Sequence, residues 1–142
     1  MAANTLAPSG FHHTRQWGSS PPNYALEYRQ LTYNYASNVA FGDPVYLSTD
    51  GYVKTVANGG TSIDGIALGV EYFDPNNIMS GRYRPAWLQP SGLNSATIVE
   101  VKVIADPQAV FYVQGRGTAL TVSSIGKNFD IYTGTSGAPA AA

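Results

Sequence analysis

The sequence has no cysteine and few charged residues. The absence of Cys among 142 residues excludes a disulfide framework, a thiol nucleophile and a cysteine-ligated zinc site. Charged residues make up 12% of the chain, well below the roughly 25% of a typical soluble domain. Because 8 basic residues face 9 acidic ones, the composition predicts neither a nucleic-acid-binding surface nor a polybasic membrane anchor. No apolar run approaches the ~18 residues that a membrane-spanning helix needs.

Motifs of common catalytic and metal sites are also missing. The chain contains no G-x-S-x-G elbow, no P-loop and no G-x-G-x-x-G fingerprint. His12 and His13 are adjacent, so their side chains would point in opposite directions from an extended segment. No carboxylate precedes Glu27 in the chain. We therefore expect no metal at the histidine pair.

A pair of facing carboxylates could still hydrolyse a glycosidic bond. Three aspartates stand beside Gly or Pro, where turn formation explains them, and two glutamates occupy outward positions of predicted strands. No catalytic pair and no cofactor are predicted, and the chain is interpreted as a protein without enzyme activity. The carboxylates considered are Asp64, Glu71, Asp74, Glu100, Asp106 and Asp130.

The clearest structural signal lies in residues 96–114. From 97 to 105 the odd positions are Thr, Val, Val, Val and Ala, whereas Glu100 and Lys102 fall on even positions, as in a strand with one buried face. Asp106-Pro107 should end this strand. A second β-prone run follows at 110–114, so the stretch predicts a strand, a tight corner and another strand.

Further β signals surround this pair of strands. Residues 45–48 and 52–56 flank Asp50-Gly51, the dipeptide favoured in a two-residue type I′ hairpin. Residues 66–73 predict a strand with Ile66, Leu68, Val70 and Tyr72 on one face, and with Gly69 where the sheet bends or another backbone comes close. One helical turn is expected at 123–126. With 15 Gly and 9 Pro, the pattern predicts an all-β fold, namely a small antiparallel barrel or sandwich of short strands.

Residues 1–35 look different from this β domain. They mix Pro, Gly, Ser and Asn with aromatic residues and show no sustained period, which predicts an extended N-terminal arm. A solvated disordered tail would be poor in aromatics and rich in charge, so the arm should lie on its own domain, on a sister subunit or on a larger assembly. The predicted organisation is an arm over 1–35, a β domain over 36–133 and a flexible small-residue tail over 134–142.

A second aromatic group occurs at residues 82–87, where Arg and Tyr alternate before Pro85. We interpret it as a Pro-interrupted edge segment or a protein contact surface. The alternative is a platform on which a base or a sugar ring stacks. The candidate contact residues are Phe11, Arg15, Trp17, Tyr24, Tyr28, Tyr33, Tyr35, Arg82, Tyr83, Arg84 and Trp87.

An ordered series of short motifs resembles the head decoration, or capsid cement, proteins of tailed bacteriophages. No single motif is diagnostic, but together they span nearly the whole chain in the same order. They are Asn4-Thr5, residues 7–11, Arg15-Gln16, residues 40–45, Gly65-Ile66, residues 68–70, residues 83–87, residues 106–114 and residues 125–128.

The resemblance implies a structural β protein that binds the outer face of a phage capsid and stabilises the expanded shell. It implies the major capsid protein as partner, a homo-oligomer, often a trimer, on the lattice, synthesis in the host cytoplasm and a final place on the virion exterior. The rival interpretation is a carbohydrate-binding β module that uses Tyr83, Arg84 and Trp87, or the Tyr-rich arm, to stack on sugars.

Overall fold

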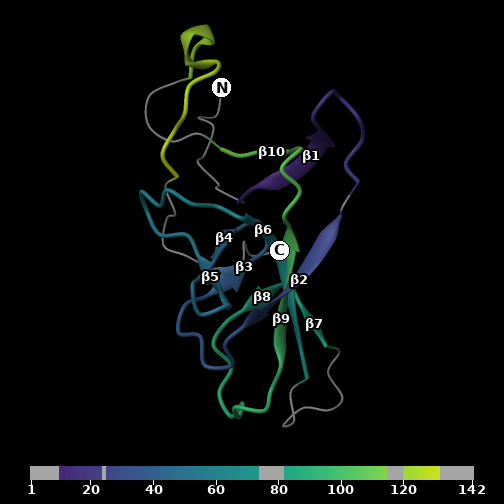
Figure 1. Ribbon diagram of the computed structural model, residues 1–142, viewed down its shortest axis with the longest axis vertical. Coiled ribbons are helices and arrows are strands. Elements are labelled where there is room, and N and C mark those ends of the chain that lie inside the picture. Colours follow the sequence, from purple (N-terminus) through teal and green to yellow (C-terminus); the bar gives the residue numbers. More distant parts are fainter. Residues whose placement is uncertain (1–9, 24, 74–81, 115–119, 132–142) are drawn as a thin grey trace, which may run out of the picture.

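The computed structural model describes residues 10–23, 25–73, 82–114 and 120–131, and there the protein is built from antiparallel strands. The predicted all-β class is confirmed (Figure 1). The elements are β1 (His12–Gln16), β2 (Leu26–Leu31), β3 (Val39–Ala40), β4 (Pro44–Leu47), β5 (Val53–Thr55), β6 (Gly65–Tyr72), β7 (Tyr83–Arg84), β8 (Ala86–Trp87), β9 (Val99–Ile104), β10 (Ala109–Tyr112) and the 3₁₀ turn η1 (Val122–Ser124).

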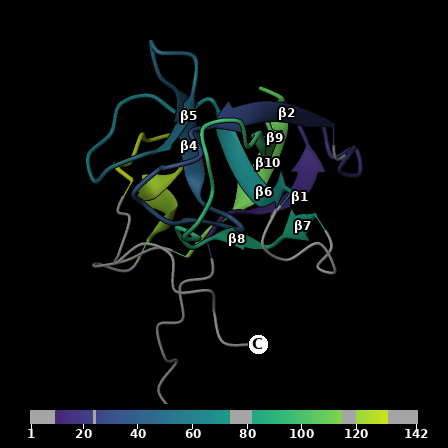
Figure 2. The same cartoon turned by 90° about the horizontal axis from the view of Figure 1, so that it is seen from below.

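The main sheet has the order β2-β9-β6-β4-β5, with β7 paired to β6, and two short ribbons, β1-β10 and β3-β8, accompany it. Figure 2 shows the main sheet curled over the ribbon strand β8. Both β3 and β8 pack against β6, so the core lies inside the curl. Its buried members are Leu31, Val39, Val45, Val53, Ala67, Val70, Tyr72, Trp87, Val99, Val101 and Val103.

Strand β9 has the alternation that the sequence predicts. Val99, Val101 and Val103 are at most 1% exposed, whereas Glu100 and Lys102 lie on the opposite face. Asp106 then makes the corner, because its Oδ1 accepts the Gln108 N–H at 2.8 Å and its carbonyl accepts the Ala109 N–H at 3.0 Å. The predicted strand, corner and strand are confirmed. The second strand, β10, pairs with β1 and not with β9.

The predicted hairpin is present as β4 and β5, with Leu47 opposite Val53. The predicted type I′ turn was wrong. Gly51 has φ +85°, but Asp50 is not among the residues with positive φ, whereas a type I′ turn needs positive φ at both positions. The Gly51 N–H donates to the Ser48 carbonyl, and the Ser48 N–H donates to Tyr52. The loop therefore has one more residue, with the glycine supplying the left-handed position that closes it.

The prediction that Ile66, Leu68, Val70 and Tyr72 share one face of β6 was wrong. The register against β9 shifts between Ala67 and Gly69, so a β-bulge reverses which side chains face the core. Ala67 and Val70 are both buried, although they stand on opposite parities of a regular strand. The predicted close approach at Gly69 is confirmed, because a Cβ there would lie 2.6 Å from Tyr83 Cε2 and 2.9 Å from the Arg84 carbonyl oxygen.

The predicted arm is corrected by the pairing of two of its segments. Strand β2 pairs with β9 along all six of its residues, from Leu26 to Leu31, and β1 pairs with β10. Residues 12–16 and 26–31 thus pack on their own domain, which was one of the open alternatives. A boundary at residue 35 would separate strands that share one sheet. The predicted tail at 134–142 lies outside the described residues.

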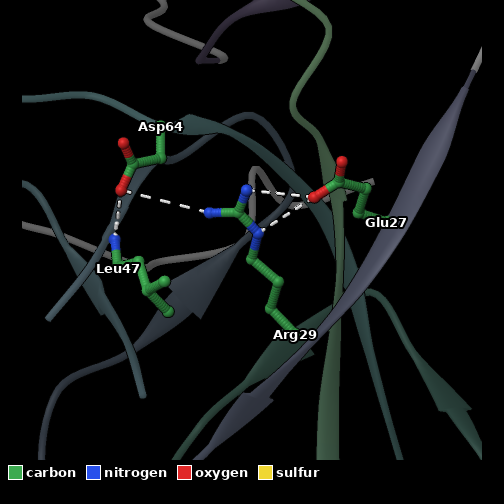
Figure 3. A network of polar contacts seen from close by, with 4 residues as sticks. All are labelled: Glu27, Arg29, Leu47 and Asp64. Carbon is green, nitrogen blue, oxygen red and sulfur yellow. Dashed lines mark hydrogen bonds and ion pairs between the residues drawn. The ribbon is translucent and has the colours of Figure 1, made fainter. Parts of the chain in front are cut away.

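The two end strands of the main sheet, β2 and β5, come near each other without pairing. The guanidinium of Arg29, in β2, contacts Glu27 Oε2 of the same strand at 3.0 Å and lies 4.0 Å from Oδ2 of Asp64, the residue before β6. The same Asp64 oxygen accepts the Leu47 N–H, as Figure 3 shows. Side-chain contacts through Asp64 therefore link β2 to the end of β4.

Candidate functional site

The predicted contact residues divide into three groups in the structure. Arg15, Trp17, Tyr28, Arg82 and Tyr83 are exposed. Phe11, Tyr33, Tyr35 and Arg84 are half-buried, and Trp87 is buried. Tyr24 lies outside the described residues.

Trp87 is a core residue, so its prediction as a contact residue or stacking platform was wrong. Its side chain is 1% exposed and packs edge-to-face on Tyr72, with ring centroids 5.4 Å apart. Its indole N–H donates to the Tyr35 carbonyl at 2.9 Å, which satisfies the one polar atom of the ring. Pro85 separates β7 from β8, and in β8 the Trp87 side chain points into the core. No ring face of Trp87 remains for a sugar.

Tyr33 and Tyr35 support the fold. Both pack against the core cluster, and the Tyr35 hydroxyl accepts the backbone N–H of Thr55 at 3.0 Å. Tyr33 also lines a hollow of about 320 Å³ beside Ile98. A second hollow, of about 470 Å³, is also lined by Ile98 and includes the predicted residue Arg82. Both hollows are lined by residues that directly precede β9, so Tyr33 and Arg82 lie near that end of the sheet.

Tyr28 and Tyr83 meet on the outer face of the main sheet, on either side of Lys102. The Lys102 ammonium lies 5.8 Å from the Tyr28 ring centroid and 4.9 Å from that of Tyr83, within the range of cation–π attraction. Its Nζ also contacts Glu71 Oε1 at 2.8 Å. The hydrogen bond to Glu71 raises the pKa of Lys102, so the cation is retained. Sequence reasoning missed Lys102 as the centre of this group, because its outward position alone did not reveal its neighbours.

The bulge in β6 places the second tyrosine of this group. Gly69 stands opposite Lys102 in the register, and the absence of a side chain there leaves the space that the Tyr83 ring occupies. The Tyr83 hydroxyl donates to the Leu68 carbonyl at 3.0 Å. Arg84 turns the other way, and its guanidinium lies 5.5 Å from the Tyr72 ring centroid. Tyr83 and Arg84 therefore do not form one platform.

The β1-β10 ribbon carries the remaining predicted contacts. Phe11 packs edge-to-face on Phe111 at 6.3 Å between centroids. Arg15 donates from Nη1 to the Ser19 hydroxyl at 3.2 Å. Trp17, directly after β1, is 80% exposed. Tryptophan is enriched among the residues that contribute most to protein interfaces, so Trp17 stays a candidate contact residue.

Several exposed apolar side chains lie on residues 120–131, hereafter the apolar segment, which the sequence analysis did not single out. Four of its residues are at least 61% exposed. Figure 1 shows the segment at the same end of the long axis as β1 and β10. The expected helical turn is present as η1 and ends near Gly126, whose φ is +78°. The absence of a period in the sequence hid the common exposure of Leu120, Val122, Ile125 and Phe129.

Three of the carboxylates considered for catalysis, Asp64, Glu71 and Asp106, have structural partners. Glu71 stands opposite Glu100 in the register, but Glu71 contacts Lys102. Asp64 binds the Leu47 N–H and Arg29, and Asp106 forms the corner before β10. Asp74 lies outside the described residues. Among those residues, no three His, Cys, Asp or Glu side chains group as metal ligands, and no described helix is long and apolar enough to cross a membrane.

Comparison with known proteins adds no relative to these observations. No protein-family model, curated protein sequence or solved structure matches the chain.

Proposed function

We propose that the protein is a structural subunit that docks on the outer surface of a tailed-bacteriophage capsid and stabilises the shell. The observation that carries the proposal is the gathering of exposed apolar side chains on the apolar segment, at the end of the molecule that also holds the β1-β10 ribbon. The choice of a phage capsid as the partner surface comes from the ordered sequence motifs that resemble decoration proteins. The expected partner is the major capsid protein, and the expected arrangement is a homo-oligomer on the lattice.

The energetics of such docking follow from the side chains. Burying a largely exposed Leu, Ile, Val or Phe side chain contributes about 1.5–3 kcal/mol. Several such side chains together can offset the free-energy cost of association, on the order of 4–15 kcal/mol. Contacts with more than one capsid subunit would add affinity because each further contact is effectively intramolecular. Since charged residues are only 12% of the chain, the affinity should depend little on salt.

The direct test is co-sedimentation of the purified protein with expanded capsids assembled without this subunit. Wild-type protein should saturate the capsids, and Ile125→Asp should lower occupancy severalfold. Ile98→Asp is the matched control, because Ile98 is also exposed, at 62%, but precedes β9 at the end of that strand away from β10. Equal occupancy by Ile125→Asp and wild type, or a loss confined to Ile98→Asp, would refute docking through the apolar segment.

Point substitutions are needed because deletion of residues 1–35 is not a clean test. That deletion would remove β1 and β2, and β2 pairs with β9 over six residues. Loss of capsid binding by the truncated chain would then report a damaged sheet. Trp17→Ala is the appropriate substitution at the amino-terminal end, because this 80% exposed indole can be removed without a loss of core packing.

The second candidate is a carbohydrate-binding module, and the observation in its favour is the pair of exposed tyrosines beside Lys102. Tyr28 and Tyr83 are 54% and 47% exposed. Because Trp87 is buried, stacking on a sugar would have to use these two rings. Glycan-array binding that is lost in Tyr83→Ala and retained in Ile125→Asp would favour this candidate over capsid docking.

A further inference from the structure

One dipeptide of the chain has a chemistry that the proposed function does not use. Asn58-Gly59 lies in an exposed turn over residues 57–60, which the Gly60 N–H closes by donating to the Ala57 carbonyl at 2.9 Å. Gly59 has φ +71°, whereas Asn58 is not among the residues with positive φ. The turn is therefore of type II, with glycine at the position that requires positive φ. It is the one Asn-Gly pair in the sequence.

We propose that Asn58 is a site of spontaneous deamidation. The backbone nitrogen of Gly59 attacks the Asn58 side-chain carbonyl carbon, Cγ. A C–N bond forms, the amide nitrogen leaves as ammonia, and the Gly59 nitrogen loses its proton, which leaves a cyclic imide. Water then adds to either imide carbonyl and breaks that C–N bond. The products at this position are an aspartyl residue with a normal backbone and its isoaspartyl isomer, whose backbone runs through the side-chain carbon.

The surroundings of Gly59 favour this ring closure. A Cβ added at Gly59 would meet no atom within 4 Å, so the imide has space on that side. Glycine also places no side chain beside the attacking nitrogen, and it is the residue with the greatest backbone freedom. Once the turn opens, the nitrogen can reach Asn58 Cγ without steric hindrance.

The two Asp-Gly pairs of the chain show why Asn58 is distinguished from them. The Asp50 carboxylate accepts Tyr52 N–H and Lys54 Nζ at 3.1 and 2.8 Å, and the hydrogen bond from Lys54 lowers the pKa of Asp50. The Asp64 carboxylate is held by the Leu47 N–H and Arg29. An ionised carboxylate is a poor electrophile. The side chain of Asn58 is a neutral amide, so its carbonyl carbon is the better target for a backbone nitrogen.

A hydrogen bond controls the reaction in the folded protein. The Gly59 N–H donates to the Ile131 carbonyl at 3.2 Å, at the end of the apolar segment. The attacking nitrogen must leave this bond, so ring closure requires the turn and Ile131 to separate locally. The imide nitrogen carries no hydrogen, and the bond to Ile131 cannot re-form until the ring opens. While the imide persists, the apolar segment therefore lacks the hydrogen bond that links Ile131 to the turn.

The test is peptide mapping of the full-length protein after incubation at mildly alkaline pH, with isoaspartate detected by enzymatic methylation. Asn58 should deamidate severalfold faster than Asn94, which is exposed and followed by Ser95. The acidic species should be missing from Asn58→Gln, where the longer side chain closes a ring much more slowly. Equal rates at Asn58 and Asn94, or the same acidic species in Asn58→Gln, would overturn the proposal.

A second measurement tests the role of the Ile131 contact. The same incubation in urea removes the fold and its hydrogen bonds. Asn58 should then react severalfold faster than in the native protein, after correction for the effect of urea on a short Asn-Gly peptide. A native rate equal to the corrected unfolded rate would show that the Gly59–Ile131 bond does not protect the site.

Discussion

The hydroxyl of Tyr35 lies 3.0 Å from both the backbone nitrogen and the Oγ1 of Thr55. Tyr35 lies in the segment after β2 and Thr55 ends β5, so this contact links that segment to the end strand β5. Strands β2 and β5 have no backbone ladder between them, so this side-chain contact forms the seam on their side of the sheet. The Tyr35 hydroxyl accepts the Thr55 N–H, which would otherwise bond to a neighbouring strand.

Tyr35→Phe should lower the free energy of unfolding by about 1–3 kcal/mol, because it leaves the half-buried Thr55 N–H without its acceptor. Urea denaturation followed by circular dichroism measures the change. Tyr112→Phe is the control, since its side chain is 69% exposed and its change should stay within about 0.5 kcal/mol. Similar values for the two variants would show that the hydroxyl of Tyr35 does not stabilise the seam.

Gly69→Ala should be strongly destabilising. The added Cβ would lie 2.6 Å from Tyr83 Cε2 and 2.9 Å from the Arg84 carbonyl oxygen, at φ +152°. We expect a loss of about 2–4 kcal/mol from overpacking and backbone strain together. Gly51→Ala is the matched variant, because φ is +85° there but no atom lies within 4 Å; it should lose about 1–2 kcal/mol.

The double variant Gly69→Ala, Tyr83→Ala separates the two contacts at Gly69. It should recover part of the loss, because the Tyr83 ring is gone but the Arg84 carbonyl remains. Strictly additive losses in the two single variants would contradict a steric conflict between residue 69 and Tyr83.

The stability of the protein should depend on pH through Asp43. Burial raises the pKa of Asp43 above its ordinary value of 3.8, and the Ala40 N–H, which donates to Oδ2 at 2.8 Å, partly opposes the rise. Between pH 3.8 and the raised pKa the unfolded chain therefore binds fewer protons than the folded one, so this contribution to stability falls as pH increases.

Asp43→Asn isolates that contribution, because an amide oxygen can still accept the Ala40 N–H without carrying a charge. Wild type should lose stability relative to Asp43→Asn as pH rises from 3.8 through the raised pKa, and the variant should be at least as stable at neutral pH. The measurement is urea denaturation of both proteins across this range. A difference that does not change with pH would refute the assignment.

The two tryptophans of the chain should give opposite fluorescence signatures. Trp87 is 1% exposed and Trp17 is 80% exposed. Trp17→Phe should therefore leave blue-shifted emission that acrylamide quenches weakly, whereas Trp87→Phe should leave red-shifted emission that acrylamide quenches strongly. Efficient quenching in Trp17→Phe would contradict the buried position of Trp87.

Where hydrophobic alternation was strong, the sequence predicted the fold correctly. The three valines of β9 and the turn residues after them determined a strand and a corner. Strand β2 was missed because Glu27 and Arg29 stand opposite Val103 and Val101, on the core-facing side of the sheet. Their charges are tolerated there because Arg29 contacts both Glu27 and Asp64, which no local pattern reveals.

The candidate site was less predictable because it depends on contacts between distant segments. A bulge adds one residue to β6 and reverses its parity, and local composition marked it only through Gly69. Trp87 and Tyr83 are four residues apart, yet one fills the core and the other lies on the outer face. Aromatic content alone could not separate these roles, since the division depends on Pro85 and on pairing with β6 and β3.

The corner at Asp106 gives the molecule a mechanical property. Strand β9 is flanked by β2 and β6 and continues through this corner into β10 of the ribbon. Tension applied at the ribbon would travel lengthwise along β9 and load the ladders on both of its sides in shear. In ladders loaded in this direction several hydrogen bonds must break together, so we expect a pull at that end of the molecule to meet high resistance.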